Sequence, residues 1–146
     1  MNEITISITK NAEEIELLRD KQSFDYTYDD ATIDLLKKNF LLDDSLYLIA
    51  KKGAEFAAFC SMDRDWWEDN YFFIREILVD PGFRKLGLGK ELMERCLQHA
   101  KDKQAIGVIT ETAFENSPMQ NLCTKLGFKE WDNPEWKDGI TYKLLF

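Results

Sequence analysis

The sequence predicts a single α/β domain with the element order β-α-α-β-β-β-α-β-α-β-β. Its 146 residues suffice for one domain with a genuine hydrophobic core. Hydrophobic residues make up 45% and charged residues 32%, as in an average globular protein. Apolar residues alternate in some segments and recur at helical spacing in others, and these two periodicities give the order of elements. No linker or internal repeat divides the chain, so we expect one domain over residues 1–146.

The first strand and helix are predicted within the first 20 residues. Ile4, Ile6 and Ile8 alternate with polar residues in segment 3–9, which predicts a half-buried strand with its isoleucines turned inward. Asn11, with a glutamate three residues on, is a variant of the capping box that opens a helix. We expect this helix to end near residue 20.

A second helix and three strands are expected next. Asp30 is placed to cap a helix that carries apolar residues on one face. Segments 45–51 and 54–62 are apolar runs joined at Lys-Gly, which is typical of a hairpin. After a polar loop with two tryptophans, segment 71–79 predicts a third strand.

The last part of the chain predicts two helices and three strands. Segment 87–102 has apolar residues at helical spacing, and segment 105–112 is a short strand. Ser117, with Pro next and Gln120 three residues on, predicts the start of a helix that stops before Gly127. The closing strands are expected at 128–131 and 140–146.

The net charge is −8, which argues against a protein whose whole surface binds nucleic acid or an anionic membrane. The first 80 residues carry 18 acidic and 9 basic side chains, whereas the rest carry 9 and 10. Cys60, Cys96 and Cys123 form no CxxC pair, and the single histidine is not spaced for a metal site with them. We therefore expect packed thiols, no metal and a cytoplasmic protein without signal peptide or membrane span.

The most informative segment runs from Ile77 to Lys90, where a strand ends in a glycine-bearing turn and an amphipathic helix follows. Such a turn presents unpaired N–H groups and the positive end of the helix dipole to an anion. Gly87 and Gly89 allow a ligand to approach the backbone, so the arrangement suits a pyrophosphate. A P-loop is excluded because the first glycine of GxxxxGK[ST] is replaced by Arg84 and the last position by a glutamate. A GxGxxG fingerprint lacks its third glycine.

This segment resembles the acyl-CoA-binding motif of the GCN5-related N-acetyltransferase (GNAT) superfamily. The pattern [RQ]-x-x-G-x-[GA] after Val-Asp-Pro is matched at every fixed position by residues 84–89. A second family block fits from Asn116 to Gly127-Phe128. The element order is also the family's, so the resemblance covers the chain and implies a mixed, mostly antiparallel central sheet flanked by about four helices.

The resemblance implies that acetyl-CoA is the acyl donor. In the family, the backbone amides of the turn hold the pyrophosphate, and the end of the preceding strand pairs with the pantetheine arm. Asn116 is the expected side-chain contact to pantetheine, a role that can coexist with capping a helix. Carried over to this sequence, the donor-binding residues are Ile77, Leu78, Val79, Arg84, Lys85, Leu86, Gly87, Leu88, Gly89, Lys90, Asn116 and Cys123.

The resemblance also implies direct attack of a neutral amine on the thioester. Val79 N–H is the expected group that polarises the thioester carbonyl and stabilises the oxyanion. Glu76 matches a position that is often acidic in the family and is the first candidate for the base, with Glu111 as the second. Cys123 stands where many members have the tyrosine that protonates the leaving thiolate, and it is either a proton donor or a packed thiol.

The acceptor is expected to be a primary amine on a small cationic molecule. The family builds its acceptor site from regions that are acidic and aromatic here, and carboxylates among aromatic faces suit a cation. Tyr26, Tyr28, Trp66, Trp67 and Glu76 are the substrate candidates within these regions. The regions also contain Phe24, Asp29, Asp63, Asp65, Glu68, Trp131 and Trp136.

Other interpretations remain open at this point. A peptide or protein N-acetyltransferase is the alternative within the enzyme class. The missing tyrosine also fits a catalytically idle acyl-CoA-binding regulator, and a plain structural domain is the third alternative. The family often forms homodimers, and a homodimer is therefore a further expectation.

Overall fold

The computed structural model describes residues 3–20 and 28–146. In these residues seven strands form one mixed sheet in the order β1-β2-β3-β4-β5-β7-β6. Only the β4–β5 pair is parallel, and it pairs over four positions, Tyr71–Ile74 with Gly107–Thr110. The α/β class, the element order and the mostly antiparallel sheet predicted from the sequence are confirmed.

The elements follow the predicted order with small shifts at their ends. The strands are β1 (Ile4–Ile8), β2 (Leu46–Lys52), β3 (Glu55–Asp63), β4 (Tyr71–Val79), β5 (Gly107–Ala113), β6 (Lys129–Trp131) and β7 (Gly139–Leu145). The helices are α1 (Glu13–Glu16), α2 (Asp30–Phe40), α3 (Leu88–Asp102) and α4 (Ser117–Lys125). A 3₁₀ segment, Leu17–Asp20, extends α1, and another, Pro81–Phe83, follows β4.

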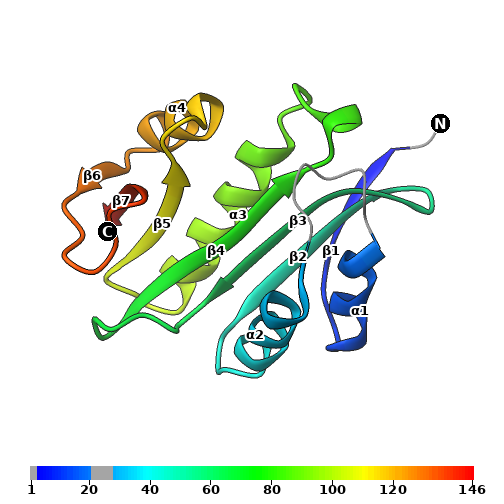
Figure 1. Cartoon of the computed structure of the whole chain (residues 1–146), viewed down its shortest axis with the longest axis horizontal. Coiled ribbons are helices and arrows are strands. Elements are labelled where there is room, and N and C mark those ends of the chain that lie inside the picture. The colour runs from blue at the N-terminus through cyan, green and yellow to red at the C-terminus, as the bar shows by residue number, and fades with distance from the viewer. Residues whose placement is uncertain (1–2, 21–27) are drawn as a thin grey trace.

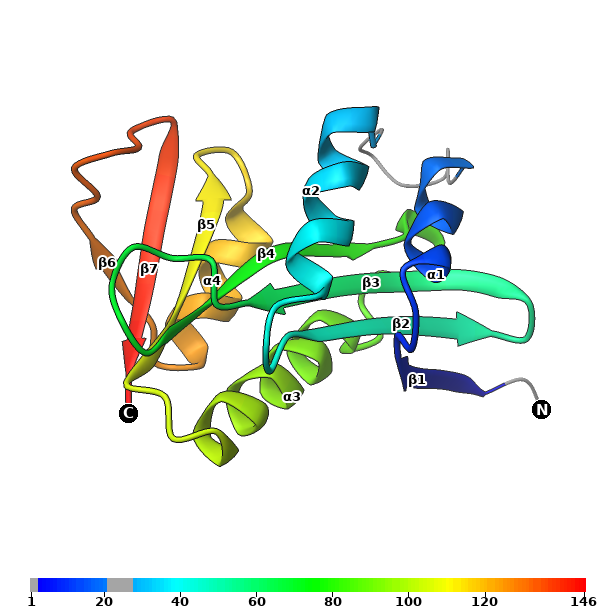
Figure 2. The ribbon, with the colours of Figure 1, turned by 90° about the horizontal axis from the view of Figure 1, so that it is seen from below.

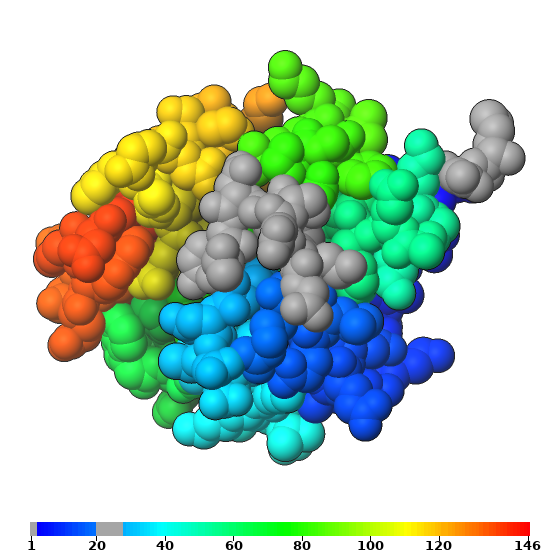
Figure 3. All heavy atoms as spheres, turned by 45° about the vertical axis from the view of Figure 1, so that its right-hand side comes forward, coloured from blue at the N-terminus to red at the C-terminus, as the bar shows by residue number. Residues whose placement is uncertain are grey.

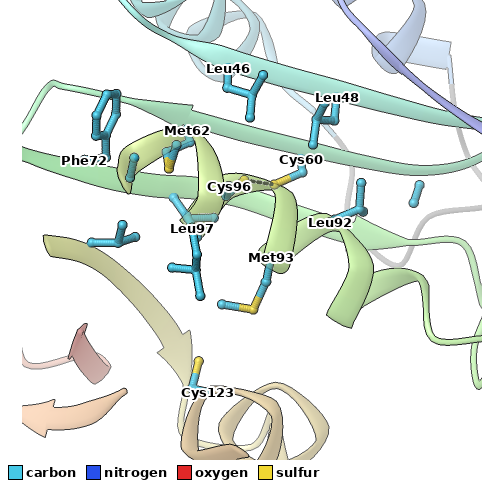
Figure 4. Close-up of a cluster of buried hydrophobic side chains, with 14 of the residues drawn as sticks. Leu46, Leu48, Cys60, Met62, Phe72, Leu92, Met93, Cys96, Leu97 and Cys123 are labelled. Carbon is cyan, nitrogen blue, oxygen red and sulfur yellow. Dashed lines mark hydrogen bonds between the residues drawn. The ribbon is translucent and has the colours of Figure 1, made fainter. Parts of the chain in front are cut away.

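Two helical layers cover the sheet, one on each face. Helices α3 and α4 lie on one face, and α1 and α2 lie on the other (Figures 1 and 2). Alternate residues of β2 supply both cores: Leu48 packs on the α3 side, whereas Tyr47 and Ile49 pack on the α2 side. The larger core contains the three cysteines as buried free thiols, with Cys60 Sγ and Cys96 Sγ 3.4 Å apart (Figure 4).

Three local expectations from the sequence are wrong. Ile8 is 61% exposed because β1 is an edge strand and the core that takes up Ile4 and Ile6 ends before it. The cap of α2 is Asp29, whose carboxylate accepts the N–H of Thr32 at 2.8 Å, and Asp30 is already inside the helix.

The third correction concerns α4. Its cap is Asn116, whose side-chain oxygen accepts Met119 N–H at 3.3 Å, and Ser117 is the first helical residue. Gln120 does not complete a capping box, because its side-chain amide donates to the carbonyls of Ala113 and Phe114. Gly127, with φ of 96°, ends the helix as expected.

No helix in the described part of the chain combines the length and apolar character needed to cross a bilayer.

The start of β5 depends on a glycine, and this gives a first testable prediction. A Cβ on Gly107 would lie 2.2 Å from the carbonyl oxygen of Leu144 on β7. We expect Gly107→Ala to lower the free energy of unfolding by more than about 2 kcal/mol, because backbone must move to admit the methyl group. Urea denaturation measures this.

The control is Gly53→Ala at the β2–β3 turn, where φ is 61° and nothing lies within 4 Å of an added Cβ. That change should cost only about 1 kcal/mol. Equal losses for the two variants would contradict the steric account of β5.

Candidate active site

A bulge in β4 determines where the polar side chains of this strand point. The β3–β4 register pairs Ser61 with Glu76 but Met62 with Ile74, which leaves Arg75 as an extra residue. A bulge of this kind bends the strand and redirects its side chains. The Arg75 guanidinium lies over the Phe73 ring, 4.8 Å from its centroid. Arg75 and Glu76 thus lie one and two positions beyond Ile74, the last residue of β4 that pairs with β5.

Glu76 is a desolvated carboxyl at this separation. Its backbone N–H donates to Ser61 Oγ at 3.1 Å, which fixes the bulge. Burial raises the pKa of the Glu76 side chain to about 7, although the positive charge of Arg75 acts in the opposite direction. A carboxyl with a pKa near 7 can take up a proton at neutral pH, as a general base must.

Arg75 is tied to the α2 side of the sheet by two carboxylates. Asp63, which is fully buried, accepts from Nε and from one terminal nitrogen of Arg75, each at 3.1 Å. The same terminal nitrogen lies 3.3 Å from Asp65 Oδ2, and Asp65 also accepts from the Asn39 side chain of α2. These contacts neutralise the Arg75 charge and hold the start of the β3–β4 loop in place.

Beyond the bulge, β4 has an open backbone edge. Asp80 N–H donates to Ala57 O at 2.8 Å, so the Ala58–Val79 pair is a position without backbone bonds to β3. The backbone groups of Val79 and, two residues earlier, Ile77 therefore face away from β3. In the described chain β5 does not pair with this part of β4. An extended group could add to this edge as a strand would.

The turn after β4 exposes backbone amides at the start of α3. Lys85 has φ of 66° and Gly87 has φ of 79°. A left-handed conformation at a non-glycine residue is uncommon and is often found at ligand sites. Arg84 Nε donates to Val79 O at 3.2 Å and links the turn to the open edge. With the positive end of a 15-residue helix behind it, the turn suits an anionic group.

Glu111 lies on β5, one position beyond its last pair with β4. Burial raises the pKa of Glu111, and the nearby charge of Arg75 partly opposes this. Buried Asn133 donates to Glu111 Oε2 at 3.3 Å and to Thr141 Oγ1 at 3.1 Å. Glu111 is thereby held next to Arg75 at the base of the separation.

An aromatic hollow of about 430 Å³ lies beside Arg75 and Glu111. Trp66 and Trp67 are stacked with ring centroids 3.9 Å apart, and Trp131 contacts both rings edge-on or tilted. The β3–β4 loop that carries the stacked pair lies against β6 and β7 (Figure 2). The lining residues are Asp65, Trp66, Trp67, Phe73, Arg75, Glu111, Asn133, Glu135 and Trp136.

The structure places the predicted site residues in different environments. Figure 3 shows a face of the molecule on which α1, α2, the turn after β4, the end of β5 and the β6–β7 connection all come to the surface. Tyr28 is instead 3% exposed and packs in the core under α1 and α2. Tyr26 and Phe24 lie outside the described residues.

Cys123 is buried in the core between α4 and α3 (Figure 4). Burial raises the pKa of its thiol to about 12, so this thiol gives up a proton less readily than an exposed cysteine.

The sequence analysis did not single out Arg75, Asn133 or Glu135. A bulge leaves no clear mark in an alternating sequence, so the redirection of Arg75 could not be read from it. The Asn133-Pro134 dipeptide signals a turn, but not that the asparagine side chain is buried against Glu111.

The family model described as "Acetyltransferase (GNAT) family" matches residues 13–128. This match spans more than half of the chain. The chain belongs to the GNAT acetyltransferase family. Enzymes of this family use acetyl-CoA as the acetyl donor, and similar solved structures contain it.

Individual GNAT relatives are more distant. A candidate [ribosomal protein bS18]-alanine N-acetyltransferase of Bacillus subtilis (strain 168) is 28% identical over 83 residues, which are 57% of this chain and 53% of that protein. The chain spans about a fifth to a half of the length of the two curated relatives it matches.

Solved GNAT structures share the fold over nearly the whole chain. The ribosomal-protein-S18-alanine N-acetyltransferase of Escherichia coli is 18% identical with a TM-score of 0.77, covering 98% of this chain and 94% of that one. A candidate streptothricin acetyltransferase of Bacillus anthracis str. Ames, solved in complex with acetyl coenzyme A, is 18% identical with a TM-score of 0.73, covering 99% and 98%.

The residues present fit acetyl-CoA as a bound substrate. A Cβ on Gly87 would meet nothing within 4 Å, so the space over the turn is open to a ligand. The turn and the open edge of β4 are linked through Arg84 and offer backbone groups along one path. Within the described residues no group of three or more potential metal ligands comes together.

The burial of Glu76 predicts a pH-dependent stability. The folded pKa of about 7 exceeds the ordinary 4.5, so folding favours the protonated form, and stability falls as pH rises from 4.5 through 7. We expect Glu76→Gln to raise the free energy of unfolding by roughly 2–3 kcal/mol at pH 8.5, because it removes the buried charge. Urea denaturation should show this gain shrinking towards zero at pH 4. A constant difference across this range would contradict the burial of an ionisable Glu76.

Proposed function

We propose that this protein transfers the acetyl group of acetyl-CoA to a primary amine on a small cationic molecule. The observation that carries the proposal is the position of Glu76: a carboxyl with a pKa near 7, next to an open strand edge that leads to an anion-binding turn. An amine attacks a thioester only when it is neutral. At neutral pH such an amine is mostly protonated, so it must first lose a proton. A desolvated carboxylate at this point supplies the acceptor for that proton.

The donor occupies the turn and the strand edge in this proposal. Amides of residues 84–89 and the start of α3 hold the pyrophosphate, with Lys90 nearby as a counter-charge. The pantetheine arm lies along Ile77 to Val79 as an added strand, and Asn116 contacts it in addition to capping α4.

Catalysis combines a base and a backbone donor. Glu76 accepts the proton of the amine directly or through a water, and Val79 N–H stabilises the charge that develops on the thioester oxygen. Glu111 remains the second candidate for the base, since it is also desolvated and lies near Arg75. We assign Cys123 to packing and not to acid catalysis, because its thiol is fully buried with a pKa of about 12.

A protein N-terminus is the second candidate acceptor. The observation in its favour is that one curated relative and one solved structure of this fold carry the name of an alanine N-acetyltransferase for a ribosomal protein. An idle acyl-CoA-binding regulator would bind the donor and transfer nothing.

The test is a thiol-release assay with acetyl-CoA against polyamines, aminoglycosides, amino acids and short peptides, run beside the melting shift with acetyl-CoA alone. We expect a stabilising shift, and CoA release with a cationic small amine. Release only with peptides would favour the second candidate, and a shift without release would favour the regulator. No shift would overturn the assignment of residues 84–89.

Glu76→Gln tests the base. We expect kcat/KM of the wild-type enzyme to rise with pH through about 7 as Glu76 loses its proton, and the variant to lose activity by roughly 10²–10³-fold together with this step. Steady-state kinetics between pH 5.5 and 9 measure both. If Glu111→Gln removes the step and Glu76→Gln keeps it, Glu111 is the base instead.

Gly89→Ala separates donor binding from folding. Gly89 lies in the first turn of α3, and an added Cβ would touch the Leu122 side chain at an ordinary 3.6 Å. Alanine is favoured over glycine in a helix by about 1 kcal/mol, so the melting temperature should not fall. We expect weaker acetyl-CoA binding by calorimetry nonetheless, because the proposal has the donor approach the backbone at Gly89 closely and a methyl group there would narrow that approach. Unchanged affinity would contradict close approach of the donor at Gly89.

A further inference from the structure

We propose that the aromatic hollow beside the separation of β4 and β5 binds a second cationic group of the acceptor, so that the preferred substrate is a diamine. This inference rests on the proposed function, since it takes the reacting amine to lie at Glu76. It adds a specificity pocket whose recognising residues are Glu111, Glu135, Trp66 and Trp136.

The walls of the hollow suit an ammonium group with an alkyl chain. Three indole side chains, those of Trp66, Trp67 and Trp136, line it together with Phe73. Trp67 is 53% exposed although its ring is stacked on Trp66. Aromatic faces attract cations through the ring quadrupole and pack against methylene groups at the same time.

The charges in the hollow favour a cation. Its one basic residue, Arg75, is bound to buried Asp63 and to Asp65, so its charge is already compensated. Glu111 and Glu135 have no ion pair with a basic side chain among residues 3–20 and 28–146. The carboxylate of Glu111 is also desolvated, and a cation beside it would compensate for the lost hydration.

The chain contains an internal example of the proposed arrangement next to the hollow. Lys143 Nζ lies 4.5 Å from the centroid of the Trp131 ring and donates to both carboxylate oxygens of Glu68, at 2.9 and 3.2 Å. Trp131 in turn contacts the stacked pair that lines the hollow. An ammonium held between an indole and a carboxylate is thus already accommodated by this surface.

The hollow is lined by Arg75, the residue before Glu76, and this placement suits an acceptor with two nitrogens on one molecule. Glu111 and Arg75 are the first residues beyond the last β4–β5 pair, and Glu76 follows Arg75 directly. One end of a short diamine must become neutral to react, and a carboxyl with a pKa near 7 is placed for that step. The other end stays protonated, and the hollow supplies carboxyl groups and indoles for it.

Intrinsic fluorescence gives a direct binding test, because the chain has four tryptophans and three of them line the hollow. We would titrate the full chain with 1,5-diaminopentane and with pentylamine, without acetyl-CoA and at matched ionic strength. We expect a saturable change, with a Kd for the diamine at least about tenfold lower than for pentylamine, as one charge-assisted contact with a cation–π contact would give. The variants are Glu135→Gln, whose exposed side chain is not part of the core, and the double variant Glu111→Gln/Glu135→Gln.

The matched control is Glu94→Gln on α3, an exposed side chain outside the hollow that changes the net charge equally. The double variant should bring the two Kd values within about threefold, Glu135→Gln should fall between, and the control should match the wild type. Equal Kd values in the wild type, or a diamine preference that survives the double substitution, would overturn the inference.

The same amines in the thiol-release assay distinguish this failure from failure of the proposed function. Release with pentylamine and no preference for the diamine leaves the acetyltransferase and rejects the pocket. Selective diamine binding without release supports the pocket and rejects transfer to such amines.

Discussion

The separation of β4 from β5 after four paired positions is the constraint on which the site depends. A parallel pair that continued to Val79 would satisfy the backbone groups of Ile77 and Val79 and leave no edge for a ligand. Because the β4–β5 pairing ends at Ile74, these groups have no strand partner on this side among the described residues. Arg75 and Glu111, the first residues beyond the last β4–β5 pair, line the aromatic hollow, and the turn with left-handed Lys85 and Gly87 follows the end of β4.

The bulge at Arg75 places ionisable side chains where β4 separates from β5, and the burial of Glu76 there lowers the stability of the fold at neutral and higher pH. It brings a cation and a carboxyl to the same place, and it buries Glu76 far enough to raise its pKa to about 7. The cation is then bound by Asp63, which is fully buried and needs a partner for its charge. Arg75 therefore compensates Asp63 more directly than Glu76, and Glu76 keeps a pKa suited to proton transfer.

Much of the fold could be predicted from the sequence because local patterns determine it. The largely apolar segment 71–79, between a polar loop and Asp80-Pro81-Gly82, predicted the limits of β4, and helical spacing predicted α3 to within one residue. Two errors concerned neighbouring residues that are equally suited to cap a helix: Asp29 and Asp30, and Asn116 and Ser117. Which residue becomes the cap depends on backbone angles that the sequence does not show. The exposure of Ile8 depends on where the core ends, which is a tertiary property.

The two halves of the site differ in how far the sequence could predict them, and the difference has a physical origin. In the proposed function, the donor is held by backbone amides of one continuous turn, so the glycines and the preceding Val-Asp-Pro are visible in the sequence as a motif. The proposed acceptor half is assembled from side chains of the β3–β4 loop, β4, β5 and the β6–β7 connection. Its key positions, Arg75, Asn133 and Glu135, acquire their roles only when the bulge and the sheet order bring these segments together. A change of acceptor therefore requires substitutions scattered along the chain, whereas the donor turn can stay the same.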